Sequence, residues 1–292
     1  MSIIRIIGRL TGIGLMLVVL SAPAFGETPV LCGTADDTAA VQAAIDAGGP
    51  VLLPVGVCAV STLDARNRPG LMIRGQGQFV SHLTPISPVN AVLDLRGSAG
   101  AILEHFSLGD HQQAVLPNTA ILLGITAVQD AAGQNSIDRV RLNNLFITGR
   151  YAVSALYVHG TASSMCSASR FWNFYEAHPV ATVFTSTDRY GLVPPTTSRW
   201  VADWTFVGCE FHSGRNGATG GAPAIVLDGA SSFRFYGGNM ASPVAPIVWA
   251  NLSHTLLFDW VGFYSDYGPT PSCAVQSAQS SSIELRGGGV LC

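Results

Sequence analysis

The residues best suited to acid–base chemistry stand close together at Glu210 and His212, with Arg215 shortly after them. Residues two apart on a β-strand share a face, so the carboxylate and the imidazole would point in one direction. Together with a guanidinium they can remove a proton beside a uronate, which is the first step of a β-elimination. The glycine-rich segment 213–221 favours a simpler alternative, a polar turn at the base of a loop.

A second group of candidate residues lies nearer the C-terminus, with Asp259 and Glu284 as catalytic acids and Arg234, Tyr236 and Arg286 as substrate-binding residues. If successive strands stack, Asp259 and Glu284 lie diagonally, at about 8 Å between their Cβ atoms. Inverting glycosidases separate their two carboxyls by about 6.5–9.5 Å, which leaves room for the attacking water. The alternative is a surface salt-bridge network, because Arg286 would then face Asp259 directly.

The elements that must position these residues are short strands, because one eight-residue phrase recurs along the chain. It has apolar residues at positions 0, 2 and 7 and a turn residue near position 4. Copies begin at Ala101, Val140, Trp204, Phe233, Leu256 and Ile283, with a weaker copy at Leu71. Alternation followed by a turn predicts a strand with one buried face, and such units must stack to bury it.

The recurring phrase therefore predicts an all-β fold, a single-stranded parallel β-helix wound right-handed, as parallel crossovers nearly always are. A β-sandwich, whose strands also alternate, is the alternative. Position 1 and position 3 of each copy would point outward, on the face where such a fold can hold an extended sugar chain.

The N-terminal end of the solenoid is expected to carry a short capping helix. Asp36 or Asp37 suits the N-cap position, and the segment 48–50, Gly-Gly-Pro, ends the helix. The apolar residues between them form a stripe of Ala40, Val41, Ala44 and Ile45. The segment 51–60 then reads as the first strands of the solenoid.

Residues 1–26 are expected to be a secretory signal peptide, with Arg5 and Arg9 before an apolar stretch and small residues at the exit. The domain would then be residues 27–292, secreted or periplasmic, with no membrane span after cleavage. The chain has 15 cationic residues, all arginine, and removal of Arg5 and Arg9 leaves 13 against 18 acidic residues, a net charge of −5. That balance argues against a nucleic-acid partner.

The six cysteines all follow the expected signal peptide, and an even number in an exported chain predicts disulfides. Their spacing does not suit zinc, and we expect neither a metal nor a cofactor. Pairing of neighbours along the solenoid axis would give Cys32–Cys58, Cys166–Cys209 and Cys273–Cys292.

The segments 36–47, 52–56 and 71–77, in that order, resemble the pectate-lyase superfamily of right-handed parallel β-helices. That superfamily includes polysaccharide lyases, glycoside hydrolases and tailspike-like depolymerases, so the resemblance implies a polysaccharide partner. The catalytic marks of its polygalacturonase branch, such as Asn-Thr-Asp and Gly-His-Gly, do not occur here. Two functions therefore remain open: cleavage of an acidic polysaccharide by hydrolysis or β-elimination, and non-catalytic binding of a polysaccharide or a partner protein.

Overall fold

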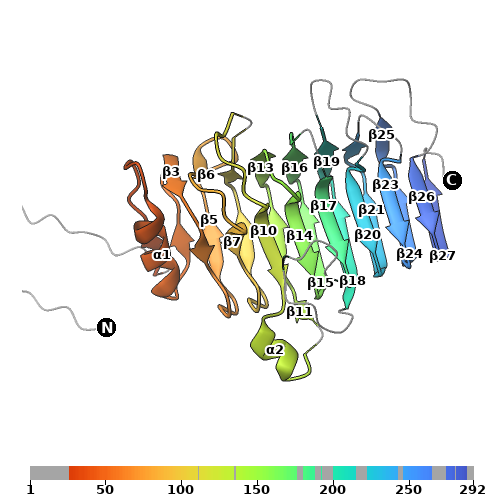
Figure 1. Cartoon of the computed structure of the whole chain (residues 1–292), viewed down its shortest axis with the longest axis horizontal. Helices are drawn as coiled ribbons and strands as arrows, with labels where there is room; N and C mark the ends of the chain where they lie inside the picture. Colours follow the sequence, from red (N-terminus) through yellow and green to blue (C-terminus); the bar gives the residue numbers. More distant parts are fainter. Residues whose placement is uncertain are drawn as a thin grey trace, which may run out of the picture.

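The chain forms one elongated solenoid in which every strand pairing is parallel (Figure 1). The computed structural model describes residues 26–110, 112–134, 136–175, 180–187, 192, 200–214, 222–242, 246–264, 274–279 and 281–287. Three sheets, called A, B and C below, run along the long axis. Each full turn of the chain contributes one strand to sheet A, one to sheet B and one to sheet C, in that order. The predicted stacking of the phrases is thus confirmed.

Sheet A has the bounds Thr28–Pro29 (β1), Val51–Leu52 (β2), Met72–Arg74 (β5), Ile102–Glu104 (β8), Arg141–Asn143 (β12), Thr161–Ser167 (β15), Val201–Val207 (β18), Ala230–Tyr236 (β21), His254–Asp259 (β24) and Ser281–Arg286 (β27). A further strand, β11 (Ile137–Asp138), pairs with the start of β15.

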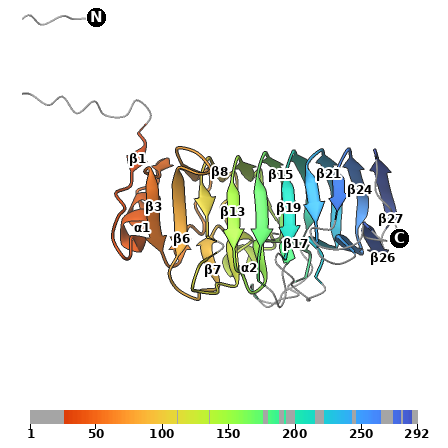
Figure 2. The same ribbon diagram turned by 90° about the horizontal axis from the view of Figure 1, so that it is seen from above.

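Sheet B follows the same order along the axis, with Gly56–Val60 (β3), Ser81–Pro85 (β6), Ser107–Leu108 (β9), Phe146–Gly149 (β13), Arg170–Asn173 (β16), Glu210–Ser213 (β19), Asn239–Ala241 (β22) and Gly262–Tyr264 (β25). Sheet C consists of Leu63–Asp64 (β4), Ala91–Asp94 (β7), Thr119–Gly124 (β10), Ser154–His159 (β14), Val180–Thr185 (β17), Ile225–Asp228 (β20), Val248–Asn251 (β23) and Val275–Ala278 (β26). Viewed from above, the strands of each sheet lie side by side along the axis (Figure 2).

The fixed turn position of the phrase has a backbone cause. Position 4 joins sheet A to sheet B and has a positive φ in each of the six strong copies, at His105, Asn144, Gly208, Gly237, Trp260 and Gly287. Glycine and asparagine tolerate this left-handed conformation, which is why the turn residue is recognisable in most copies.

One turn of the solenoid was not predicted from the sequence. Strand β15 lies between β12 and β18, and its phrase begins at Ser164, which is buried like the apolar residues it replaces. Its turn residue is Ala168, with φ 47°. A serine at position 0 and an alanine at the turn do not match the recurring phrase, which is why this copy was not recognised. The additional turn places Met165 between Arg141 and Thr205 in the outward column at position 1.

The core inside the solenoid contains stacked aromatic rings in successive turns. The ring centroids of Phe206 and Phe235 are 4.5 Å apart, and those of Phe235 and Phe258 are 4.8 Å apart. These spacings match the distance between neighbouring strands, because position 2 of each phrase points inward at the same level. Buried side chains of this kind hold each turn in register with the next.

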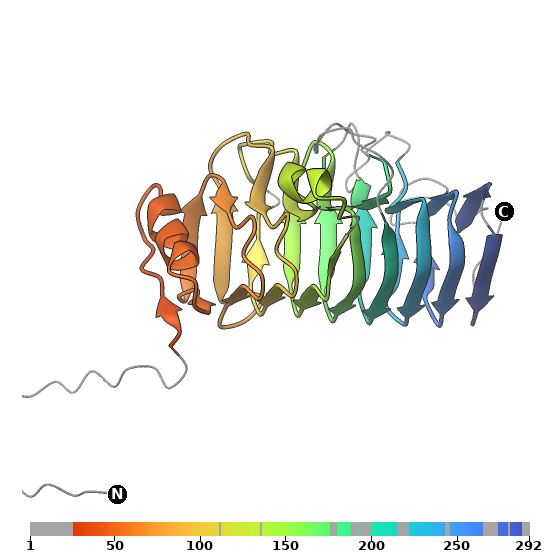
Figure 3. The same cartoon turned by 90° about the horizontal axis from the view of Figure 1, so that it is seen from below.

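The predicted N-terminal cap is confirmed as α1 (Thr38–Asp46), which covers the first turn at one end of the solenoid (Figure 3). Val41, Ala44 and Ile45 of the predicted stripe are buried, whereas Ala40 is exposed. A second short helix, α2 (Ala127–Ala131), protrudes between β10 and β11 and begins at Thr126 with a capping box.

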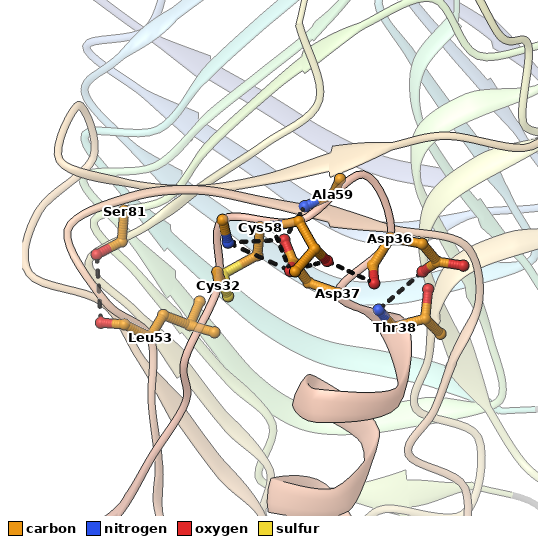
Figure 4. Close-up of a disulfide and its surroundings, with 10 residues drawn as sticks. Cys32, Asp36, Asp37, Thr38, Leu53, Cys58, Ala59 and Ser81 are labelled. Carbon is orange, nitrogen blue, oxygen red and sulfur yellow. Dashed lines mark hydrogen bonds between the residues drawn. A yellow bond between two sulfur atoms is a disulfide. The ribbon is translucent and has the colours of Figure 1, made fainter.

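The predicted Cys32–Cys58 disulfide is present and ties the segment before α1 to β3 (Figure 4). The predicted Cys166–Cys209 disulfide is not formed: the two cysteines are buried thiols with their sulfurs 2.7 Å apart. They are neighbours in adjacent turns, as expected, but the axial pairing was inferred from sequence order alone, which does not fix sulfur geometry. Cys273 and Cys292 lie outside the described residues.

Candidate functional site

The column predicted on the outer face of sheet A is present. Tyr236 pairs with Asp259, and Asp259 pairs with Arg286, at the C-terminal ends of β21, β24 and β27. Arg234 and Glu284 lie two residues earlier on their strands, separated by Leu257 of β24. Parallel pairing without a register shift therefore places all five predicted residues on one surface.

The ion pair in this column differs from the expected one. The Arg286 Nε donates to Glu284 Oε1 at 2.7 Å, two residues along the same strand, in place of a contact across to Asp259. The hydrogen bond that Arg286 donates to Glu284, together with the negative charge of that carboxylate, raises the pKa of Arg286. The side chains of Glu284 and Arg286 are 57% and 55% exposed. Glu284 is thus held by a guanidinium on the open surface rather than directed toward Asp259, as in an ordinary surface salt bridge.

The second predicted group, on sheet B, is more closely assembled. His212 of β19 hydrogen-bonds through Nε2 to the Tyr264 hydroxyl of β25 at 3.3 Å. The two residues face each other across Ala241, which occupies the intervening strand β22 in the same register. A larger residue than alanine would fill this space, so the small side chain permits the contact.

Glu210 and Trp172 complete the surroundings of His212. Glu210 pairs with Arg170 of β16, with 3.3 Å between the Arg170 Nε and Glu210 Oε2. Trp172, next to His212 in register, has its ring centroid 5.0 Å from that of the imidazole. Glu210 is thus held by an arginine beside the imidazole, and Arg215, predicted to bind substrate, lies outside the described residues.

Aromatic rings continue from this group along the outer face of sheet B. The Phe146 ring lies 5.1 Å from Trp172, and the Phe79 ring lies 5.4 Å from Phe146. At the other end the His212 and Tyr264 rings are 5.8 Å apart. This row, called the aromatic row below, consists of Phe79, Phe146, Trp172, His212 and Tyr264. Trp172, His212 and Tyr264 share one register, whereas Phe146 lies two residues earlier on its strand and Phe79 precedes β6, so the row crosses the sheet obliquely.

Sequence reasoning did not connect Arg170, Trp172 and Tyr264 with His212. The three residues were separated from it by the unrecognised turn at β15 and β16 and by a loop of unknown path. The signal that could have found them is the order of the phrases, since position 8 after Ser164, Trp204 and Leu256 gives Trp172, His212 and Tyr264. Without the Ser164 copy this column cannot be completed.

Within the described part of the chain, no group of three or more His, Cys, Asp or Glu side chains is arranged to hold a metal ion. A search of the same residues for a helix long and apolar enough to cross a membrane also found none.

No family model and no curated protein matches the chain. Solved structures match its fold over most of its length. The enzymatically active domain of tailspike protein 2 from bacteriophage CBA120 is 15% identical with TM-score 0.54, over 88% of this chain and 41% of the other. ORF18 of Geobacillus virus E2 is 14% identical with TM-score 0.54, over 89% and 59% of the two chains. The gp42 tailspike of Acinetobacter phage vb_AbaP_AS12 is 11% identical with TM-score 0.52, over 89% and 51%.

The chain is a right-handed parallel β-helix. This is the fold that the resemblance to the pectate-lyase superfamily implied. The β-helix spans between about two-fifths and three-fifths of the length of these tailspike and virus proteins. At identities of this size the likeness establishes the fold, and the activity must be argued from the side chains.

Proposed function

We propose that this β-helix cleaves an acidic polysaccharide by β-elimination, with His212 as base and Tyr264 as acid. The observation that carries the proposal is the hydrogen bond between the Tyr264 hydroxyl and His212 Nε2. It joins the two proton-transfer groups that this reaction needs, on a rigid sheet beside an aromatic ring.

The reaction on a uronate breaks the C5–H bond and the C4–O glycosidic bond and forms a C4–C5 double bond. The His212 imidazole accepts the C5 proton while the Tyr264 phenol donates its proton to the departing C4 oxygen. The proton on His212 Nε2 then passes to the Tyr264 oxygen along the hydrogen bond that joins them, which restores both groups. Each residue therefore begins the next cycle in its original state.

The residues around this pair support substrate binding. Trp172, in contact with His212, offers an apolar surface against which the C–H face of a sugar ring can pack. Arg170 supplies positive charge near the imidazole, although Glu210 partly neutralises it. Arg215 remains a proposed substrate-binding residue on its position in the sequence, three residues after His212.

Hydrolysis by Asp259 and Glu284, with Arg234, Tyr236 and Arg286 binding the sugar, is the other catalytic assignment. The Glu284–Arg286 ion pair weighs against it, because Arg286 engages the proposed acid in place of the sugar. A non-catalytic role in binding polysaccharide is favoured by one separate observation, the aromatic row, because aromatic rings can pack against sugar rings without any proton transfer.

Export belongs to the same proposal. Tailspike proteins, one of them described as enzymatically active, share this fold, and a uronate polymer is encountered outside the cell or in the periplasm. Mass spectrometry of the protein recovered from the culture medium or periplasm is expected to find an N-terminus after Ala24 or Gly26. An intact Met1 would contradict export through this segment.

The test of the activity is incubation of the purified protein with a panel of polyuronates, followed by the ultraviolet absorbance of the new C4–C5 double bond. His212→Gln and Tyr264→Phe are each expected to lower the rate by about 10²–10⁴-fold, as for loss of a general acid or base. The control is Tyr236→Phe, a comparable hydroxyl deletion on sheet A, which should leave the rate unchanged.

Other results would be equally informative. New reducing ends without ultraviolet absorbance would show that the reaction is hydrolysis rather than elimination, and would favour Asp259 and Glu284 as the catalytic pair. Binding of the glycans without any cleavage would establish the non-catalytic alternative.

A further inference from the structure

A hollow of about 550 Å³ lies on the outer face of sheet A, away from His212 and Tyr264. Its polar lining includes Arg139, Arg141 and Arg234, together with Asp203 and Thr205. We propose that this arginine hollow, defined by Arg139, Arg141 and Arg234, is a non-catalytic site that binds the carboxylates of an acidic polysaccharide. The inference rests on the proposed function for its substrate class but concerns a different surface.

The hollow exists because the strands of sheet A bend at one level. Residues immediately before each phrase have a positive φ in eight successive turns, at Gly70, Gly100, Arg139, Ser163, Asp203, Ser232, Thr255 and Ser282. Six of the eight are not glycine, so each of those six turns accepts about 1–2 kcal/mol of backbone strain at this level. A bend repeated in register across stacked strands turns a flat sheet face into a groove along the axis, and the hollow lies in it.

The side chains on either side of this bend point outward. Position 0 of each phrase is buried at Val140, Ser164, Trp204 and Phe233, and the backbone of two of these, Val140 and Ser164, forms the floor of the hollow. Arg139, Arg141 and Arg234 are all exposed. Alternation along β12 and β21 therefore directs Arg141 and Arg234 outward, and Arg139, at the bend just before β12, lines the same hollow.

The charge of the hollow is unbalanced. None of its three arginines forms an ion pair with a residue in the part of the chain that the structure describes. Elsewhere on the outer faces Arg74 pairs with Glu104 and Arg170 pairs with Glu210. Three guanidinium groups against the single carboxylate of Asp203 favour an anionic ligand, and guanidinium groups bind carboxylates in a bidentate manner.

The spacing suits a linear polymer better than a small anion. Arg141 and Arg234 occupy the same column with Met165 and Thr205 between them, so their Cα atoms are about 14 Å apart. Arg139 lies two residues before Arg141, which begins β12, so extended backbone would place their Cα atoms about 7 Å apart. A single carboxylate cannot bridge the outer two arginines, whereas a chain with a carboxylate on each sugar can reach both when it lies along the axis.

The experiment measures equilibrium binding of a polyuronate oligosaccharide to the full chain by calorimetry, for the wild type and for Arg141→Gln and Arg234→Gln. Each substitution is expected to weaken binding by about tenfold or more, as for loss of a charge-assisted hydrogen bond. Arg66→Gln is the matched control, since Arg66 pairs with Asp64 on sheet C and its loss changes the net charge equally. The control should bind as the wild type does.

Two further arms make the result decisive. A neutral oligosaccharide of the same length should bind more weakly than the polyuronate, and higher salt should narrow that difference. Equal loss of affinity in Arg66→Gln would attribute the effect to net charge and overturn the proposal. Unchanged affinity in both hollow variants, or binding of a sulfated glycan but not of the polyuronate, would overturn it as well.

Failure here and failure of the proposed function are distinguishable. Ultraviolet absorbance with a polyuronate tests His212 and Tyr264, whatever the arginines do. Loss of affinity in Arg141→Gln tests the hollow, even if no bond is cleaved. Thermal unfolding checks that each variant is folded, and little change is expected because the arginines are exposed and make no ion pair with the described residues.

Discussion

Asp37 fastens the N-terminal cap to the solenoid. Its carboxylate accepts hydrogen bonds from the Gly33 and Thr34 amides, the Thr34 hydroxyl and the Ala59 amide of β3. The hydroxyl of Thr34, with these amides, lowers the pKa of Asp37 from 3.8 to about 2. Figure 4 shows the carboxylate beside the Cys32–Cys58 disulfide. The hydrogen bonds of Asp37 and the disulfide therefore both attach the segment before α1 to strand β3. Asp37 is therefore a fastening residue, and the amide of Thr38 is instead bound by Asp36.

Asp37→Asn is expected to lower the free energy of unfolding by about 1–3 kcal/mol at neutral pH, because the amide nitrogen cannot accept from the donors that remain. The folded pKa lies below the unfolded value, so the carboxylate's contribution is present above about pH 4 and lost as pH falls through about 2. Denaturant unfolding at pH 7 and pH 2 checks this.

The stability difference between wild type and Asp37→Asn should shrink at the lower pH. Asp46→Asn, which removes an exposed partner of Arg68, is the control and should cost about 1 kcal/mol or less. A difference that stays constant from pH 7 to pH 2 would contradict the assigned role of the carboxylate.

At the scale of the element, the unit of this protein is the strand of sheet A with its turn into sheet B. The turn residue is left-handed in every strong copy, whether it is glycine, asparagine, histidine or tryptophan. The solenoid geometry thus imposes the left-handed conformation, and its conformational free-energy cost differs from one residue type to another. Ala168 is a costly case, since it has φ 47° and no polar side chain to compensate.

Ala168→Gly is expected to raise the free energy of unfolding by about 0.5–1 kcal/mol, because relief of the left-handed strain exceeds the extra entropy of glycine in the unfolded chain. The same change at Ala59, within strand β3, should destabilise the protein by a similar amount. Chemical denaturation of the two variants beside the wild type measures both. Destabilisation by Ala168→Gly would show that the turn is not strained.

At the scale of the whole molecule, stability comes from stacking along one axis, and the disulfide found among the described residues lies at the N-terminal end. Cys32–Cys58 closes a segment of 26 residues around α1, while Cys166 and Cys209 remain thiols in the core. Burial raises the pKa of Cys166, so its reactive thiolate is scarce at neutral pH. The two pairs should therefore respond differently to the same reagents.

Replacement of Cys32 and Cys58 by serine is expected to lower the free energy of unfolding by about 3 kcal/mol, as for a disulfide that closes a loop of this length. In the wild-type protein an alkylating reagent should modify Cys166 and Cys209 only after unfolding. Peptide mass spectrometry before and after denaturation measures this. A Cys166–Cys209 disulfide in the native protein would contradict the thiol state.

Much of this architecture could be predicted from the amino-acid sequence. Apolar residues at positions 0, 2 and 7, with a turn near position 4, were enough to predict parallel stacking, because strand periodicity and the φ of a turn are local properties. The segment 38–46 was recognisable as a capping helix for the same reason. The column Tyr236, Asp259 and Arg286 followed from counting positions within consecutive phrases.

Only the tertiary structure decided which side chains meet. Ser164 and Ala168 conceal a turn of the solenoid, and without it neither Trp172 beside His212 nor Met165 between Arg141 and Thr205 can be placed. The contact of His212 with Tyr264 depends on the small side chain of Ala241 between them. Arg286 forms its ion pair with Glu284 rather than with Asp259. Local pattern determines the strand and its inward face, whereas pairing across the surface depends on how many turns intervene and which rotamers their neighbours allow.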